Sequence, residues 1–345
     1  MEVSLAGPGY GECVLIHVGN HRWVVVDSCL DADLQPVALS YLRNLGFDPA
    51  NVVDLIVATH WHDDHIRGMS DVVEACGSAI FCCSSALSTK EFQVLAGTAE
   101  SSSGTRMSSG VREYVNTRAL LFERGSTTRY AQADKLILSD GDFNVWSLSP
   151  ADRDFDLFLQ GITQMVEGSN GHRGRLTTLK PNDTSVVLLI EIGEMAVLLG
   201  GDLERQGWLA ILEGARQVTK AASAFKVPHH GSEGAHDDRV WTEMLGDGTV
   251  AILTPWWNGG RHLPTRRGVE RMLRFTDEVY ITAEPGHPPP RASRSRDRMM
   301  ERTLRESGST IRSVAFTSGI VRLRKNKVPS EHWRVERFGT ARQLQ

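Results

Sequence analysis

Residues Thr59–Met69 read THWHDDHIRGM and directly follow the apolar run VDLIVA at residues 53–58. Three histidines and two aspartates crowd positions 60 to 65 of this stretch. A buried segment cannot hold two carboxylates without partners, and a solvated charged loop is rarely built from histidine. The pattern therefore predicts a short buried strand that ends in side chains directed at a divalent metal ion, or at a pair of them.

The spacing HxHxDH divides these side chains between two ions. In a turn that leaves a strand, side chains two positions apart share a face, so we expect His60 and His62 to bind one ion. Asp64 and His65 then turn toward a second ion. Imidazole suits zinc, whereas a carboxylate also admits harder ions such as manganese. A chance histidine-rich turn without metal is the alternative, and this crowding disfavours it.

A further acid follows another apolar strand. In LLGGDLE, Asp202 comes after two glycines that allow close backbone approach, and it has no cationic neighbour in the sequence. We expect Asp202 to bridge the two metals, although an aspartate after a strand is also a common helix N-cap. Glu204 either orients a ligand, protonates a leaving group, or is an ordinary glutamate of a first helical turn.

The stretch KVPHHGS, residues 226–232, repeats the arrangement with His229 and His230. Adjacent histidines point in different directions, so one is expected to ligate metal and the other to face substrate. We assign His229 to the metal and His230 to catalysis. The sequence leaves the opposite assignment open, as it does a purely structural pair.

The composition is that of an ordinary soluble protein. The chain has 345 residues, 41% of them hydrophobic, and no apolar run is long enough for a membrane helix. Its first residues lack the basic and apolar features of a signal segment. The five cysteines are odd in number and lack the CxxC spacing of a thiolate zinc site. We therefore expect reduced cysteines, a cytoplasmic location and no membrane partner.

Charge is unevenly distributed along the chain. The net charge is −4, but residues 288–345 carry 14 Lys/Arg against 5 Asp/Glu, or +9, which leaves −13 for the remainder (24 against 37). An acidic body with a basic tail is a pattern of proteins that meet polyanions. A basic segment that serves only solubility is the alternative.

Strands and helices alternate, with several hairpins, which predicts two mixed β-sheets with helices outside them, an αββα sandwich of the α/β (α+β) class. Hairpins are expected around GNH at residues 19–21, around GEM at 193–195, and in VAFTSGIVRLR at 314–324. We predict one domain over residues 1–325, with a polar surface insertion at about 88–130 and a helical insertion at about 288–308. Residues 326–345 are predicted to form a basic C-terminal tail.

HxHxDH, the aspartate at a strand end and the later histidine pair together resemble the metallo-β-lactamase fold superfamily. The closer similarity is to the hydrolase domain of the competence protein ComEC and its soluble relatives. That subgroup has further motifs, matched here by Gly11-Glu12, VVVDSC with Asp27, NDTSVVLLIEIG, HHGS and, with looser spacing, NGGRHLP. The resemblance covers roughly residues 3–325.

The resemblance implies additional site residues. The chain departs from the superfamily pattern in two places, at the segment of Asn182 and Ser185 and at Arg67. Asn182 and Ser185 occupy the segment where many members have a third histidine for the first metal. His172, in a glycine-rich loop, is the alternative third ligand. Arg67 stands where relatives often have glycine, and we expect it near the mouth of the site, either on an anion or in a surface ion pair. The similar family position gives His262 a role in substrate binding or in support of the site.

These residues predict a metal-dependent hydrolase in which two ions roughly 3.5–4 Å apart share an acid and an activated hydroxide. A phosphodiester of nucleic acid or a nucleotide is the expected substrate, because of the resemblance, Arg67 and the basic tail. A lactone, thioester or β-lactam hydrolase and a non-catalytic binding module are the alternatives. The expected residues are His60, His62, Asp64, His65, Asp202 and His229 for metal, Asp64, His230 and Glu204 for catalysis, and Arg67, Asn182, Ser185, Ser232 and His262 for substrate.

Overall fold

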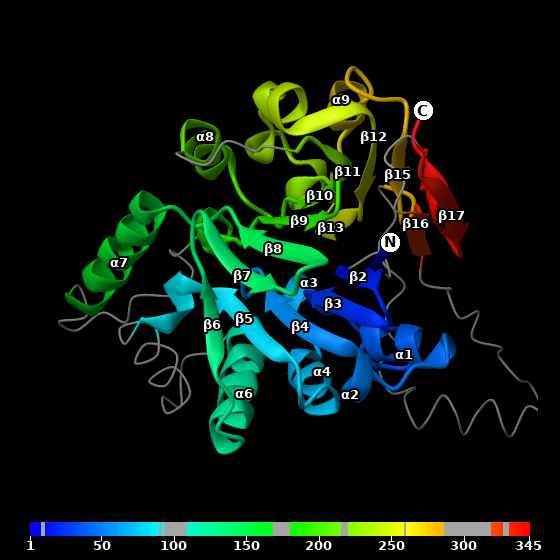
Figure 1. Ribbon diagram of the computed structural model, residues 1–345. Helices are drawn as coiled ribbons and strands as arrows, with labels where there is room; N and C mark the ends of the chain where they lie inside the picture. The colour runs from blue at the N-terminus through cyan, green and yellow to red at the C-terminus, as the bar shows by residue number, and fades with distance from the viewer. Residues whose placement is uncertain are drawn as a thin grey trace, which may run out of the picture.

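The computed structural model describes residues 1–7, 11–89, 92, 109–167, 180–214, 220–258, 260–285, 319–326 and 331–345. Two eight-stranded sheets face each other, and helices lie on the outer side of each (Figure 1). The predicted αββα sandwich is therefore confirmed.

The first sheet has the order β17-β16-β1-β2-β3-β4-β5-β6. Its strands β1 to β3 and their neighbours β16 and β17 pair antiparallel, whereas β3, β4, β5 and β6 run parallel. The bounds are β1 Glu2–Gly7, β2 Cys13–Gly19, β3 Arg22–Val26, β4 Val53–Ala58, β5 Ile80–Ser84, β6 Thr128–Ala131, β16 Gly319–Arg324 and β17 Arg334–Phe338.

The second sheet has the order β18-β15-β12-β11-β10-β9-β8-β7, with β10, β11, β12 and β15 parallel. A separate two-stranded ribbon, β13-β14, follows β12. The bounds are β7 Lys135–Ser139, β8 Phe143–Ser147, β9 Leu188–Ile192, β10 Met195–Leu199, β11 Ala222–Lys226, β12 Leu245–Leu253, β13 Trp256–Asn258, β14 Arg261–Leu263, β15 Val279–Ile281 and β18 Arg342–Gln343.

Helices α1, α2, α4 and α6 cover the first sheet, and α8 and α9 cover the second (Figure 1). The helix bounds are α1 Val37–Asn44, α2 Pro49–Val52, α3 Asp63–Ile66, α4 Met69–Ala75, α6 Ser109–Glu123, α7 Asp152–Glu167, α8 Arg205–Glu213 and α9 Arg266–Met272. Short helical turns span Ser85–Ser88, Pro181–Thr184, Pro228–Gly231, Glu233–Ala235 and Val240–Met244. Within the described residues, no helix is long and apolar enough to cross a membrane.

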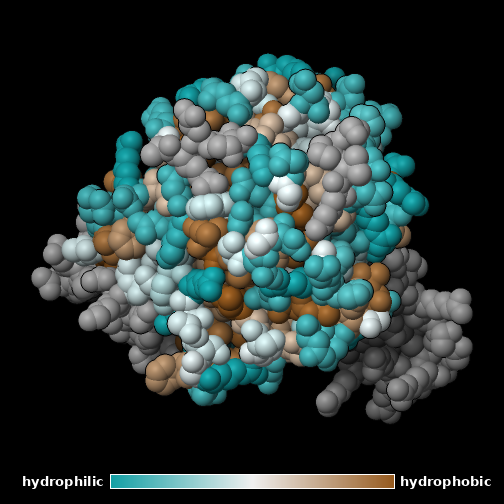
Figure 2. All heavy atoms as spheres, in the orientation of Figure 1, coloured by the Kyte–Doolittle hydropathy of each residue, from teal (hydrophilic) through white to brown (hydrophobic). Residues whose placement is uncertain are grey.

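Alternating side chains explain why both faces of each sheet are buried. In β4, Leu55 and Val57 point into the core between the sheets, whereas Ile56 and Ala58 pack under the helices. Because successive strand residues face opposite sides, an uninterrupted apolar run produces a strand that is buried on both. In Figure 2 hydrophobic residues gather across the middle of the face shown, over the region of the two sheets.

The predicted hairpins at residues 19–21 and 193–195 join β2 to β3 and β9 to β10. Asn20 and His21 take positive φ values of 50° and 59°, which suit a tight hairpin turn. The first arm of the third expected hairpin, residues 314–318, lies outside the described residues. Its second arm is β16, which pairs with β1 and with β17.

Two of the predicted boundaries are wrong. Within 88–130 the chain forms α6, and its residues Val111, Tyr114 and Leu121 are buried in the core under the first sheet, so this part is not a surface insertion. The described part of the C-terminal tail adds edge strands β17 and β18 to the two sheets. Hydrophobic anchors such as Trp333 override the basic composition there. The expected insertion at 288–308 lies outside the described residues.

Truncation after Asn326 is therefore expected to destabilise the fold rather than remove a passive tail. Loss of Trp333 alone, which is 9% exposed and donates to Ser223 Oγ at 3.1 Å, should cost about 3–5 kcal/mol. Urea unfolding of the truncated chain and of Trp333→Ala measures this. An unchanged midpoint for the truncated chain would contradict the structural role of β17 and β18.

Candidate metal centre

The candidate residues meet at one edge of the sandwich, where strands from both sheets end. His60 follows β4, Asp202 follows β10, and His230 follows β11. Because β3 and β4 are parallel in one sheet, and β10 and β11 in the other, their carboxyl ends bring these residues together.

Asp202 lies at the centre of the group. Its Oδ1 is 3.3 Å from His65 Nε2, and its Oδ2 is 3.9 Å from His60 Nε2 and 3.8 Å from His230 Nε2. The backbone N–H of Asp202 donates to Ser185 Oγ at 3.0 Å, which fixes the turn that presents the carboxylate. A side chain at Gly201, where φ is 51°, would collide with Ser185, so glycine is required at this close approach.

Asp64 and His62 complete the group from the HxHxDH turn. Asp64 Oδ2 is 3.4 Å from His230 Nε2, and His62 Nδ1 is 3.0 Å from His60 Nε2. The His/Asp cluster is defined here as His60, His62, Asp64, His65, Asp202 and His230.

The donor atoms of this cluster fit divalent metal. Among the described residues, His65 Nε2, His230 Nε2 and Asp202 Oδ1 are buried and have no hydrogen-bond partner. Ligand atoms of His60, His65 and Asp202 lie within 4.8 Å of one another. Since buried polar atoms are nearly always paired, atoms that converge without partners are suited to a shared cation.

The other ring nitrogens of the two central histidines are already held by the protein. His65 Nδ1 lies 2.7 Å from Asp27 Oδ2, and His230 Nδ1 lies 2.9 Å from Thr254 Oγ1. Such contacts orient a ligating imidazole and leave its Nε2 for metal.

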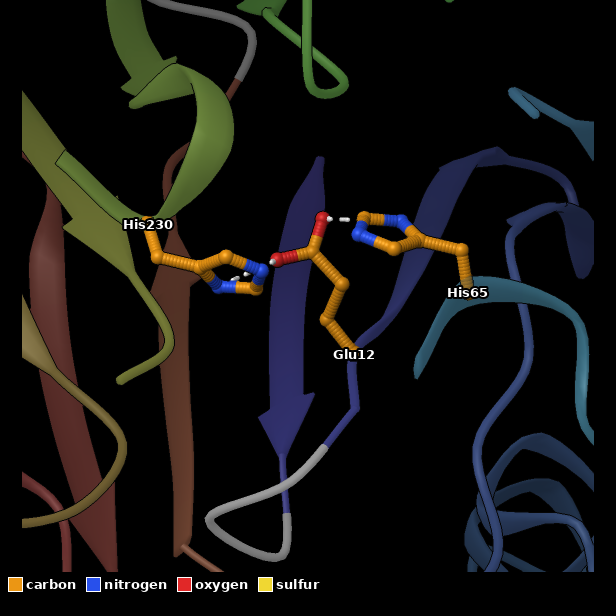
Figure 3. A group of neighbouring side chains, drawn as sticks. All are labelled: Glu12, His65 and His230. Atoms are coloured by element: carbon orange, nitrogen blue, oxygen red, sulfur yellow. Dashed lines mark ion pairs between the residues drawn. The ribbon is translucent and has the colours of Figure 1, made fainter. Parts of the chain in front are cut away.

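Glu12 lies behind this layer, between the two histidines (Figure 3). Its carboxylate is 3.6 Å from His65 Nδ1 and 3.8 Å from His230 Nδ1, and it accepts from Thr254 Oγ1 at 2.7 Å. Because it faces nitrogens that are already hydrogen-bonded, Glu12 supports the cluster rather than joining its metal-facing side.

Lys226 is the cation of this supporting layer. It is 1% exposed, forms a close ion pair with Glu12, donates to Gly201 O at 2.8 Å and lies 3.7 Å from Asp202 Oδ1. Burial lowers the pKa of Lys226, but the charges of Glu12 and Asp202 outweigh it and raise the pKa above its usual value. Lys226 therefore stays charged inside the protein.

The electrostatics of the cluster call for more positive charge. Burial alone raises the pKa of Asp202, yet the neighbouring His65 and His230 lower it well below its usual value. Burial, with His65 and His62 beside it, lowers the pKa of His60 well below its usual value, so this imidazole is neutral and able to ligate. Burial lowers the pKa of His65, but the charges of Asp202, Glu12 and Asp27 outweigh it and raise the pKa well above its usual value. Without metal, the ionised carboxylates of Glu12, Asp27, Asp64 and Asp202 (−4) stand against Lys226 and His65 (+2), a net charge of −2.

His229 and His230 have the opposite positions to those we assigned. His230 is 1% exposed and faces Asp64 and Asp202, whereas His229 has a 23% exposed side chain directed at Glu204 Oε1, 3.0 Å away. Both histidines adopt left-handed φ values, 46° and 53°, which are costly for non-glycine residues. This turn sends the second imidazole, not the first, into the His/Asp cluster.

Asn182 and Glu204 lie at the outer side of the cluster with His229. Asn182 Nδ2 is 3.3 Å from His229 Nε2, and its Oδ1 is buried without a hydrogen-bond partner in the described structure. Burial lowers the pKa of His229, but the hydrogen bond that its ring donates to Glu204, together with the charges of Asp202 and Glu204, outweighs burial and raises the pKa.

Three other expected substrate residues, Arg67, Ser232 and His262, lie on segments that adjoin the cluster in the sequence or the fold. Arg67 has a 46% exposed side chain and pairs with Asp63 at 3.3 Å. Ser232 Oγ accepts from Gly234 N–H at the start of a helical turn, and His262 is exposed on β14. His172 lies outside the described residues.

Comparison with known proteins identifies the family. The sequence matches the family model described as "Metallo-beta-lactamase superfamily" over residues 6–240, which is more than half of the chain. The chain belongs to the metallo-beta-lactamase superfamily. The predicted resemblance is confirmed, and the protein is a hydrolase of that superfamily.

Individual relatives of the superfamily are distant. Over 105 residues the chain is 29% identical to "ComE operon protein 3" of Bacillus subtilis (strain 168), a match that covers 30% of this chain and 13% of that protein. This agrees with the resemblance to ComEC-like hydrolases. Among solved structures, the metallo-beta-lactamase fold protein YhfI of Bacillus subtilis is 15% identical to this chain, with a TM-score of 0.41. The match covers 83% of this chain and 98% of YhfI. A B3 metallo-beta-lactamase with an active-site glutamic acid is 18% identical with a TM-score of 0.32, covering 57% and 59%.

Sequence reasoning missed the supporting layer of this superfamily site. Glu12 and Asp27 entered only as matches to family motifs, and Lys226 was not singled out. The available signal was a charged residue, Lys226, inside the otherwise apolar strand end FKV, since a buried lysine needs an anionic partner.

Proposed function

We propose that this chain hydrolyses phosphodiesters of nucleic acid or nucleotides by means of two divalent metal ions. The observation that carries the proposal is the His/Asp cluster, in which His65 Nε2, His230 Nε2 and Asp202 Oδ1 are buried and converge from both sheets without a hydrogen-bond partner among the described residues. A non-catalytic module would have no reason to maintain four buried carboxylates, Glu12, Asp27, Asp64 and Asp202, at this edge.

The two ions are assigned to the two halves of the cluster. His60 and His62 would hold the first ion, Asp64, His65 and His230 the second, and Asp202 would serve both. Zinc or manganese suits this mixture of imidazole and carboxylate. Two dications would offset the four buried carboxylates, which leaves the Lys226 ammonium to balance the activated hydroxide.

Metal at this position supplies an activated water and polarises the electrophile. The protein's own residues supply orientation. Asp27 and Thr254 hold the two central imidazoles, and Lys226 with Glu12 holds the turn that carries Asp202. On the outer side of the cluster, the Glu204 carboxylate holds the ring of His229, and Asn182 contacts the same ring. These three polar side chains would face the groups attached to the phosphate that is cleaved.

The support for an anionic substrate differs from the sequence-based argument. In the described part of residues 288–345, Arg324 is paired with Glu2 and Glu336, and residues 331–345 carry only +1. Residues 255–274 carry five arginines against one acid, Glu270. Three of these arginines are ion-paired, Arg266 with Glu270, Arg271 with Glu233 and Arg274 with Asp238. Arg271 of this segment lies 3.5 Å from Gly231 O, next to His230.

A substrate screen tests the proposal. The chain loaded with zinc or manganese is expected to hydrolyse bis-p-nitrophenyl phosphate and at least one of single-stranded DNA, duplex DNA, RNA or a cyclic nucleotide. Chelation should abolish this activity. Turnover of a lactone or thioester, with every phosphodiester left intact, would overturn the phosphodiester proposal while leaving the metal centre standing.

The histidine assignment has its own test. His230→Ala is expected to lose about one bound metal per chain, because His230 Nε2 faces Asp64 and Asp202, whereas His229→Ala should keep the full complement. Metal content by inductively coupled plasma mass spectrometry after gel filtration measures both. Loss of metal in His229→Ala with none lost in His230→Ala would restore the original assignment.

A further inference from the structure

The β13–β14 ribbon, Trp256–Asn258 and Arg261–Leu263, follows β12 on the chain near the edge that carries the His/Asp cluster. It belongs to neither large sheet. Thr254, just before it, contacts His230 Nδ1 at 2.9 Å, and Pro264, just after it, packs so closely on Gly231 that an added Cβ there would lie 3.2 Å away. Trp257 comes three residues after Thr254, so its Cα lies within roughly 10 Å of it.

The tryptophans of the ribbon have no role in the core. The chain has eight tryptophans, and six of them pack in the three hydrophobic clusters: Trp23, Trp61, Trp146, Trp208, Trp241 and Trp333. Trp256 and Trp257 belong to none of these clusters and are only half-buried. The ribbon also lies beyond residues 6–240, which the superfamily model matches.

Polar and cationic groups share the ribbon with these indoles. Trp257 pairs across the ribbon with His262, and Asn258 pairs with Arg261. Cross-strand partners have their Cβ atoms about 4.5–5.5 Å apart, so the indole of Trp257 and the exposed imidazole of His262 emerge side by side. Residues 255–274 carry +4 in a body that carries −13 over residues 1–287.

We propose that this ribbon is a binding site for single-stranded nucleic acid, with Trp257 stacking on an unpaired base next to the scissile phosphate and Arg261 contacting the backbone. The inference rests on the proposed phosphodiester substrate and specifies its class. An aromatic side chain that reaches the surface stacks on any base, and a nearby arginine neutralises phosphate, which is the usual combination in single-strand binding. A neutral small-molecule substrate would use neither group.

Binding measured without hydrolysis tests the ribbon directly. With zinc or manganese bound, fluorescence anisotropy compares a labelled twelve-residue oligothymidylate whose linkages are hydrolysis-resistant phosphorothioates with an abasic phosphorothioate oligomer of equal length and charge. Trp257→Ala is expected to weaken binding of the oligothymidylate by about 5- to 150-fold and to leave the abasic oligomer unchanged, because only the first has bases to stack. Trp257→Phe should retain much of the affinity.

Two further variants separate stacking from charge and from general damage. Arg261→Ser should weaken both oligomers and reduce the salt slope by about 0.7, as expected for one lost contact to single-stranded phosphate. Phe122→Ala removes an aromatic side chain that is 86% exposed on α6 and should change neither.

The possible failures are distinguishable. The ribbon is not a base-stacking site if Trp257→Ala binds the oligothymidylate as tightly as the parent, or if the substitution weakens binding of both oligomers by the same factor. The same conclusion follows if the parent binds the oligothymidylate no more tightly than the abasic oligomer. If the ribbon behaves as expected but the metal-loaded parent cleaves no phosphodiester, the proposed reaction fails and the binding site stands.

Discussion

Asp64→Ala is expected to lower phosphodiester hydrolysis by about a thousandfold or more while the protein stays folded. Asp64 faces His230 Nε2 at 3.4 Å and would hold the second ion, and metal ions contribute several kcal/mol to transition-state stabilisation. The measurement is kcat/KM on bis-p-nitrophenyl phosphate at saturating zinc or manganese, with circular dichroism to show that the fold is retained.

The neighbouring aspartate provides a matched control. Asp63 differs from Asp64 by one position but faces away from the cluster, toward Ser109 and Arg67. Asp63→Ala should therefore keep most of the activity and the full metal content. Wild-type rates in Asp64→Ala on every substrate, or equal losses in both variants, would contradict the two-metal arrangement.

Lys226→Met is expected to destabilise the metal-stripped protein by about 3–5 kcal/mol, since it leaves Glu12 as an unpaired buried charge. Lys226 and Glu12 are 1% and 2% exposed at their side chains, so solvent cannot replace the lost partner. The double variant Glu12→Gln/Lys226→Met should recover a large part of the loss, because it removes both charges. Urea unfolding of the four proteins gives the coupling between the two residues.

An exposed arginine is the control for this cycle. Arg266 is paired with Glu270 on α9 with a 92% exposed side chain, and Arg266→Met should leave the unfolding midpoint unchanged. Additive effects of the Glu12 and Lys226 substitutions would show that the ion pair does not stabilise this edge.

The sequence predicted the fold class and the strand ends that carry the site. The apolar run before His60 alternates between two buried faces, and that pattern is local. Several histidines and aspartates directly after a buried strand also indicate a metal site from the local sequence alone, because buried polar side chains need partners. These features explain why the positions of His60, His62, Asp64, His65 and Asp202 in one cluster could be predicted.

Only the tertiary structure decided which groups complete and support the cluster. The choice between His229 and His230 depends on two successive left-handed residues, which direct the second imidazole inward, and no sequence period predicts such a turn. The Glu12–Lys226 pair joins residues 214 positions apart in sequence and on different sheets. Trp333 likewise converts a basic C-terminal segment into sheet edge, because burial of one large side chain outweighs the composition around it.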